Sequence, residues 1–436
     1  MSFPILTVIA LLPIVGGVIT MMLRGAAARA TGMVFSLVTL VLGVYAFIVG
    51  VNGTNLSETH RWIRAVGAWY ALGGDGLSLT MILLVVILVP VVLLAEWHVG
   101  DDETARWSTG AFFGLALMLE GLAIYCFAAT DVLLFYLMFE ATLIPMYFLI
   151  AGWGGPRRGR AAMKFLLYSL AGGLVMLFAV IGVGVHGGSF LLSDLAKVDF
   201  SGAIGKELFV GFFIAFAIKA PMVPVHTWLP DTAEQATAGA SSLLVGLLDK
   251  IGTFGMLRLC LGLFPAASDW ATPFVLTLAI ISVLWGAMMA ATSSDLMRFV
   301  SYLSKSLRLY GHWHFRADDD VDHRFDLLHV QPRLFDGSVV PRAWFPGAQG
   351  RDGEGRRLRW RPEGRPGTCR NFPLRRAGNP VVAGHGKLCE RVHGLSWCLV
   401  ASPNLCRHFH HRHGAGCGVR SGDVPTHYDR PGAGCL

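Results

Sequence analysis

The chain has 436 residues, of which 54% are hydrophobic and only 15% charged, and its mean hydropathy is +0.54. This composition excludes a water-soluble globule and a disordered chain for most of its length. Residues 1–303 carry 15 Lys and Arg against 17 Asp and Glu, whereas residues 304–436 carry 21 against 12 and hold eleven of the 15 histidines. The basic balance belongs to the second segment alone, so two chemically different polypeptides are joined near residue 303.

Apolar runs of roughly 20 residues, the length that spans about 30 Å of hydrocarbon, recur through residues 1–303 and predict an all-α polytopic membrane protein. The first run has no positively charged residue before it, which favours an uncleaved membrane helix over a signal peptide. A tenth, interrupted helix begins at Leu296. The nine complete predicted helices are Phe3–Leu23, Thr31–Gly50, Gly76–Ala95, Thr109–Ala129, Asp131–Trp153, Ala161–His186, Glu207–Val225, Ala236–Phe264 and Ala271–Ser294.

Basic residues gather in the connections that follow odd-numbered predicted helices. Arg24 and Arg29 follow the first helix, residues 157–164 include four basic side chains after the fifth, and Arg298 follows the ninth. Cytoplasmic loops are enriched in Lys and Arg. We therefore predict that these connections face the cytoplasm and that the N-terminus lies outside.

Ionisable residues inside the predicted helices are the candidate functional residues, because each costs at least roughly 2.5 kcal/mol at the bilayer centre. Glu140 lies near the middle of the fifth helix and Lys250 in the middle of the eighth. Lys219 lies in GFFIAFAIKAPMVPVHTWLPD, where three prolines remove backbone donors and break the helix beside the charge. Broken helices at membrane depth are typical of ion-carrying sites. Glu120 is a weaker candidate, which could simply face a polar groove.

These charges together suggest a proton relay, because a neighbouring carboxylate stabilises the charged form of a buried lysine. We expect Glu140 and Lys219 to approach one another as a switchable ion pair and Lys250 to receive the proton when the pair separates. His226, next to the helix break, is a further candidate for the proton path. The alternatives are a purely structural Glu140–Lys219 pair and a His226 that only holds the break by a hydrogen bond.

Three segments resemble the proton-translocating M subunit of bacterial respiratory complex I, which is chain 4 of the mitochondrial enzyme. They are FEATLIPMYFLIAGWGG, FFIAFAIKAPMVPVHTWLPDTAEQATAGASSLLVGLLDKIGTFGMLR and DLMRFVSY. The resemblance covers residues 1–303. It implies an antiporter-like fold of fourteen helices built from two inverted repeats, of which this segment holds the first nine to ten. By the same resemblance Glu140, Lys219 and Lys250 match the family's proton-relay residues.

The resemblance also implies a function. The chain is expected to be a membrane subunit of NADH:quinone oxidoreductase, in the bacterial inner membrane, that translocates protons as electrons pass from NADH to quinone. Its expected partners are the other membrane subunits of the complex, the lipid bilayer and protons. NADH, flavin and iron–sulfur sites lie on other subunits of the family's complex, so we expect no cofactor, no metal, no direct NADH contact and no nucleic acid on this chain. The alternative is a subunit of a multisubunit cation/proton antiporter without redox partners.

Residues 304–436 depart from the family completely. Leu307–Phe315 can be encoded so that dropping one base yields FGFMVIGIF, an apolar membrane segment. His329–Asp336 can be encoded so that the same change yields MFNHGFST, which resembles the family's next helix. A frame shift after about residue 304 therefore explains the segment, which we expect to be a disordered basic tail without a domain. The chain would then be a sequencing artefact or a truncated, non-functional product.

The alternative for the tail is a genuine domain. Its basic stretch RDGEGRRLRWRPEGRPGTCR could bind nucleic acid or anionic lipid. A zinc site is also conceivable, although the spacing of its ligands fits no standard finger. The side chains that would form such a site are Cys398, Cys406, His408, His411 and His413.

We predict that residues 304–436 form no packed membrane domain, because a segment rich in charge and histidine cannot satisfy its polar groups in lipid. Protease treatment of membranes that carry the chain should remove the tail and leave the helices before Leu303. Mass spectrometry of the protected fragments measures this outcome. A compact tail fragment that resists the protease would contradict the frame-shift hypothesis.

Overall fold

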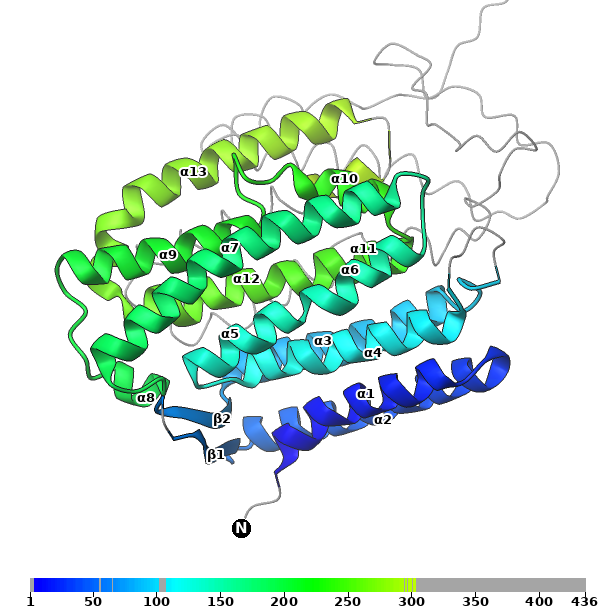
Figure 1. Cartoon of the computed structure of the whole chain (residues 1–436), viewed down its shortest axis with the longest axis horizontal. Coiled ribbons are helices and arrows are strands. Elements are labelled where there is room, and N and C mark those ends of the chain that lie inside the picture. Colours follow the sequence, from blue (N-terminus) through cyan, green and yellow to red (C-terminus); the bar gives the residue numbers. More distant parts are fainter. Residues whose placement is uncertain are drawn as a thin grey trace, which may run out of the picture. The chain divides into compact units, whose positions relative to one another are not determined.

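The computed structural model describes residues 4–54, 56–64, 66–101, 107–293, 295, 297–299 and 301–302. Helices dominate this part of the chain and lie side by side along a common direction (Figure 1). The predicted helical membrane bundle is therefore confirmed for the described residues. The predictions for the tail, its frame shift and its cysteine–histidine group, lie outside the described residues.

The observed helices follow the predicted apolar runs closely. Seven of the described helical segments are long and apolar enough to cross a membrane: α1, α2, α3, α4, the α5–α6 segment, α7 and α13. The other two predicted spans are helical but interrupted, as described below. The longer elements are α1 (Ile5–Met22), α2 (Gly25–Val51), α3 (Gly76–Ala95), α4 (Thr109–Ala128), α5 (Val132–Ala141), α6 (Leu143–Gly152), α7 (Arg158–Gly187), α9 (Ala203–Lys219) and α13 (Pro265–Thr292).

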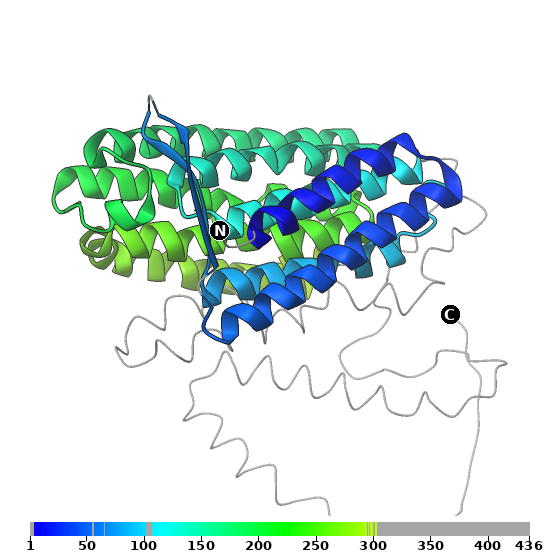
Figure 2. The same cartoon turned by 90° about the horizontal axis from the view of Figure 1, so that it is seen from below.

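The pair α1 and α4 approaches closely because glycines line both helices. A Cβ atom added to Gly17 would lie 2.6 Å from the carbonyl oxygen of Gly114, and one added to Gly114 would lie 2.5 Å from that of Gly17. Only glycine permits this backbone contact, which is the small-residue packing typical of membrane helices. The α1–α2 pair lies along one side of the bundle (Figure 2).

A two-stranded antiparallel hairpin, which the all-helical prediction did not contain, connects α2 to α3. Its strands are β1 (Leu56–Ile63) and β2 (Ala68–Gly74). Gly67 turns the chain between them at a φ of +74°, a conformation that favours glycine. The Glu58 carboxylate in β1 accepts hydrogen bonds from the backbone N–H of Leu6 and the hydroxyl of Thr7, so the hairpin caps the start of α1. We call this the hairpin end of the bundle.

The α6–α7 connection and the end of α13 lie at the end of the bundle opposite to the hairpin (Figure 1). We call this the arginine end and define it by Arg157, Lys164 and Arg298, which bind the same carboxylates of α10. Arg29, which the structure places in the first turns of α2 and not in a connection, forms an ion pair with Asp101 after α3, so the start of α2 and the end of α3 also lie together. Hydrogen bonds from His98 and Arg29 hold the pKa of Asp101 below its ordinary value. The gathering of these basic residues at one end agrees with the predicted orientation, while the side of the membrane that it faces stays a prediction.

The fifth predicted span is divided into α5 and α6 at Thr142, two residues after Glu140. Pro145 has no N–H to donate to the carbonyl of Ala141, so the regular hydrogen-bond pattern cannot continue through this point. The hydroxyl of Thr142 donates to the carbonyl of Phe139 at 2.7 Å and satisfies part of the break. The sequence offered this signal in LIPMYF, but the prediction treated the span as one helix.

The seventh predicted span is broken at the lysine that it carries. Helix α9 ends at Lys219, the chain runs through residues 220–227, and α10 (Trp228–Gln235) follows. The eighth predicted span is one helical path with changing geometry. It comprises α11 (Ala238–Leu243), the π-helical η1 (Leu244–Leu248), α12 (Asp249–Gly255) and the π-helical η2 (Met256–Leu261), and a short helix α8 (Leu192–Leu195) lies between α7 and α9.

Thiol labelling tests the orientation. Gly159 at the arginine end has open space around its Cα, so Gly159→Cys fits without rearrangement. Cys126 and Cys260 are buried, and the six tail cysteines are replaced by serine so that they do not react. An impermeant thiol reagent should label Gly159→Cys only in inverted vesicles, and the matched variant Ser57→Cys at the hairpin end only in intact cells. The reverse pattern would overturn the orientation.

Candidate functional site

Lys219 is the most deeply buried of the predicted relay residues. Its side chain is 1% exposed at the last residue of α9, and its Nζ makes no hydrogen bond among the described residues. The Nζ atom lies 4.7 Å from the ring centre of Phe139 in α5 and 5.8 Å from that of Phe165 in α7. The charges of Glu140 and Asp249 also act on it. The lysine therefore lies among aromatic rings, with carboxylates near it but outside hydrogen-bond distance.

Glu140 lies against α7 at a glycine. A Cβ atom added to Gly173 would fall 1.9 Å from Oε1 of Glu140, so only a residue without a side chain leaves the carboxylate its present position. The neighbouring Gly172 faces α9, where a Cβ would meet the side chain of Ile218 at 3.2 Å. The two glycines let α7 lie close to both charged helices, as the views of α5, α7 and α9 in Figure 1 show.

The predicted Glu140–Lys219 ion pair is not closed in this structure. None of the ion pairs among the described residues joins the two side chains, although their charges interact. The physical reason is their placement: the carboxylate lies against Gly173, and the ammonium lies over the ring of Phe139, the residue before Glu140. The structure thus holds the two groups near one another without contact, and their switching stays a prediction.

Lys250 lies in the α-helical turn between the two π-helical segments. Its side chain is 4% exposed, and the preceding Asp249 is fully buried. Two residues further on, Gly252 packs against α9, where a Cβ would meet that of Lys219 at 3.2 Å. The helix that carries Lys250 therefore contacts the helix that carries Lys219 close to both charges. The π-helical geometry, which is frequent at functional sites, was not predicted from the sequence.

His226 lies on the segment that joins α9 to α10, and its side chain is 7% exposed. Its ring lies 6.2 Å from that of Trp285 in α13. The segment is held from three sides: the backbone N–H of Val223 donates to Ser282 of α13 at 2.9 Å, Trp228 donates to the carbonyl of Ile218 at 2.9 Å, and Lys164 of α7 donates to the carbonyl of Thr227 at 3.0 Å. The helix break therefore has a defined structure, and it lies on the side of Lys219 that faces the arginine end of the bundle.

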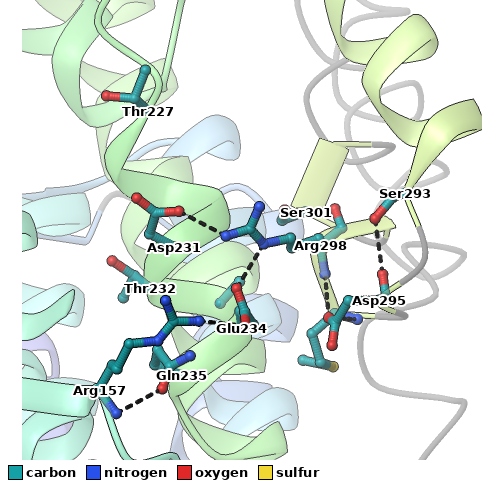
Figure 3. A network of polar contacts seen from close by, with 12 residues as sticks. Arg157, Thr227, Asp231, Thr232, Glu234, Gln235, Ser293, Asp295, Arg298 and Ser301 are labelled. Atoms are coloured by element: carbon teal, nitrogen blue, oxygen red, sulfur yellow. Dashed lines mark hydrogen bonds and ion pairs between the residues drawn. The ribbon is translucent and has the colours of Figure 1, made fainter. Parts of the chain in front are cut away.

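A polar network fixes α10, the half-helix after the break (Figure 3). Arg298 donates to Asp231 at 3.0 Å and to Glu234 at 2.7 Å. Lys164 of α7 binds Asp231 at 2.7 Å. Arg157 lies 3.5 Å from Glu234. Three segments far apart in the sequence meet here: residues 157–164, α10 and the chain at Arg298.

The carboxylates of this network stabilise the positive charge of Arg298. Burial acts against it, but the hydrogen bond and charge of Glu234 and the charge of Asp231 outweigh burial and raise the pKa of Arg298. Sequence reasoning placed the basic residues at one end but did not find their partners. The signal was present in WLPDTAEQ, where Asp231 and Glu234 are three residues apart and therefore lie on one helix face.

Glu120 is the remaining charged candidate, and none of the ion pairs among the described residues joins it to a lysine. The side chain lies in α4, is fully buried, and neither carboxylate oxygen makes a hydrogen bond among the described residues. The groove-facing alternative stated above required polar neighbours. The structure gives Glu120 none within hydrogen-bond distance in the described part of the chain.

Comparison with known proteins adds an independent observation. Residues 129–306, which include Glu140, Lys219 and Lys250, match the family described as NADH:quinone oxidoreductase/Mrp antiporter, TM. The chain is 41% identical to NADH-quinone oxidoreductase subunit M of Mycobacterium tuberculosis, over 70% of this chain and 63% of that protein. The match to the family ends near the predicted break at residue 304, and the chain spans less than two thirds of the length of this relative.

Solved structures give the same fold. A chain of respiratory complex I from Thermus thermophilus with bound NADH superposes with a TM-score of 0.63 at 32% identity, covering 69% of this chain and 62% of that one. A chain of the Mrp complex from Dietzia superposes with a TM-score of 0.60 at 23% identity, covering 69% and 33%. The second similarity shows the fold alone.

Removal of Arg298 tests the network around α10. Arg298→Ala takes one cation from each of two carboxylates, so we expect a stability loss of about 1 kcal/mol. Arg298→Lys should recover only part of it, because an ammonium cannot present the planar fork that bridges two carboxylates. The thermal unfolding midpoint of the full chain in detergent measures both. The exposed Arg160, replaced by alanine, is the control, and an equal midpoint for Arg298→Ala and Arg160→Ala would contradict the assignment.

Proposed function

We propose that the chain, whose residues 129–306 match the NADH:quinone oxidoreductase/Mrp antiporter family, conducts protons as a membrane subunit of an NADH:quinone oxidoreductase. The relatives include subunit M of such an enzyme. Because this chain spans only 63% of that relative, the proposal concerns the part that residues 1–303 supply. The activity of the whole subunit requires the helices that the relatives have in addition.

One observation carries the proposal: a lysine ammonium lies fully buried at the end of a broken helix, without a hydrogen bond among the described residues. A charge in such a place is costly and marks an ion pathway by default. Glu140 and Asp249 lie near enough for their charges to act on Lys219. A purely structural lysine would be expected to close an ion pair, and this one does not.

In the proposed relay Lys219 carries the proton and Glu140 favours its charged form, since an opposite charge stabilises it. When the influence of Glu140 weakens, the proton passes to Lys250 on the adjacent helix, which contacts α9 at Gly252. His226 lies on the arginine side of Lys219, where it could pass protons to the lysine from the predicted cytoplasmic face. Each step moves only a proton, and the electrons move elsewhere in the enzyme.

The proposal also covers the partners of the chain and its location in the membrane. Its partners are the other membrane subunits of the complex and the surrounding lipid, and it lies in the bacterial inner membrane with its N-terminus outside. Oxidation of NADH and reduction of quinone are assigned to other subunits, so no redox centre, cofactor or metal is proposed for this chain. No contact with nucleic acid is proposed either.

The family description also covers cation/proton antiporters, which form the second candidate function. A subunit of an antiporter would exchange protons for cations without NADH. Membranes that carry the assembled complex separate the two functions. Proton uptake that starts on addition of NADH and stops with a quinone-site inhibitor supports the oxidoreductase, whereas uptake that depends on a cation gradient supports the antiporter.

Substitution of the two central charges tests the relay. We expect the chain as it stands not to pump alone, so the variants are made in a coding sequence whose reading frame is restored after residue 304. Glu140→Gln and Lys219→Ala should each abolish NADH-linked proton uptake while the assembled complex is still present. Acidification measured with a pH-sensitive dye, together with native gels for assembly, gives both readings.

The matched control is Lys206→Ala, which removes a lysine at the other end of the same helix α9. It should leave proton uptake near the unmodified level. Full uptake by Glu140→Gln in assembled complex would show that the glutamate is structural, and the relay assignment would then be withdrawn.

A further inference from the structure

The ammonium of Lys219 lies over two aromatic rings. The Nζ atom lies 4.7 Å from the ring centre of Phe139 and 5.8 Å from that of Phe165. Both distances fall within the about 6 Å over which the negative face of a ring attracts a cation. The attraction is strongest where water is absent, and the lysine and both phenylalanines are 0–1% exposed. The rings therefore stabilise the charged form of the lysine by their electrostatics.

The carboxylates of Glu140 and Asp249 do not compete with the rings for contact with the Lys219 ammonium in this structure. No ion pair within 4.0 Å involves Lys219 among the described residues. The Glu140 carboxylate lies against α7 at Gly173, where its position depends on the missing side chain. Lys219 thus lies where the charges of two carboxylates act on it, and it is bound to neither.

The two rings are fixed by other contacts. Phe139 packs against Phe135 and edge-on against Phe216, with ring centres 5.9 Å away in both cases. Phe165 packs against Trp228 at 5.4 Å, and the indole N–H of Trp228 donates to the carbonyl of Ile218, the residue before Lys219. The rings are therefore held on both sides of the helix break, and their positions do not depend on the lysine.

We propose that Phe139 and Phe165 are positioning residues that hold the protonated Lys219 by cation–π contact and keep it out of an ion pair with Glu140. The proposal rests on the proposed function and deepens it. A ring attracts the ammonium but not the neutral amine, so the contact exists only while the lysine carries its proton. Once the proton leaves, the side chain is released from the rings, and recapture requires a new proton. We call the rings of Phe139 and Phe165 the cage. The cage thereby links the position of the Lys219 side chain to its charge.

Fluorination of the rings separates this electrostatic role from packing. Phenylalanine with one, two or three ring fluorines has nearly the same shape, while each fluorine weakens the negative face. The series is incorporated at residue 139 of the full chain, and its thermal unfolding midpoint is measured in detergent. We expect a stepwise fall at residue 139 and a shallower one at residue 165, whose ring is farther from the ammonium. The same series at Phe216, which packs against Phe139 without reaching the lysine, is the matched control.

The same fluorine series in a Lys219→Met chain makes the test independent of proton pumping. In Lys219→Met the side chain has no charge, so fluorination at residue 139 should lower the midpoint no more than fluorination at residue 216 does, since only the ring–ring contact remains. A fall as large in Lys219→Met as in the lysine chain, or no fall in the lysine chain, would overturn the cage.

Proton uptake by the frame-restored complex then tests the positioning role. NADH-linked uptake should fall stepwise with fluorination at residue 139 and stay constant at residue 216. Constant uptake at residue 139 would overturn the positioning role even if the midpoint falls. Full uptake by Lys219→Met would instead refute the proposed function, and the midpoint series would still decide whether the cage exists.

Discussion

The burial of one lysine ammonium, that of Lys219, away from water is the constraint on which the arrangement of this structure depends. At the depth of the bilayer a charge without compensation is among the costliest groups that a helix can carry. Lys219 is placed where α9 stops, at the contact of α9 with α12 beside Gly252 and under the rings of two other helices. The compensation is distributed over rings and nearby carboxylates, so no single ion pair locks the charge in place.

A broken helix at that depth requires partners for its free backbone groups, because lipid offers none. The structure supplies them from neighbouring helices: Ser282 of α13 for the N–H of Val223, and Lys164 of α7 for the carbonyl of Thr227. Lys164 also binds Asp231, where the network of α10 begins. The break and the charged network are therefore one continuous structure, and α7 takes part in both.

Each relay residue lies beside an irregularity of its helix. Glu140 precedes the interruption between α5 and α6, Lys219 ends α9, and Lys250 lies between two π-helical segments. Irregular backbone inside a membrane protein is tolerated where protein surrounds it. At these positions the backbone can depart from ideal helix geometry at little extra cost in free energy. The departure places the charged side chains where a regular helix would not.

The sequence by itself determined the long apolar spans and the charged residues that they carry. Apolar length placed the ends of the long helices to within six residues, and the prolines after Lys219 marked the break, because hydropathy and missing backbone donors are local properties of the chain. Hydropathy did not show the hairpin of residues 56–74, whose pairing depends on a turn at Gly67 and on contact with α1. The π-helical segments also escaped prediction, since no local signal distinguishes them.

Only the tertiary structure decided what surrounds each charge. Glutamate and lysine were expected to pair because opposite charges in lipid attract, and that argument used residue types alone. The fold instead sets the Glu140 carboxylate against Gly173 of α7 and the Lys219 ammonium over Phe139 of α5. Likewise Arg298 finds Asp231 and Glu234 across segments that are distant in the sequence. Contacts of this kind depend on how separate helices pack, which a one-dimensional pattern of apolar and charged residues does not contain.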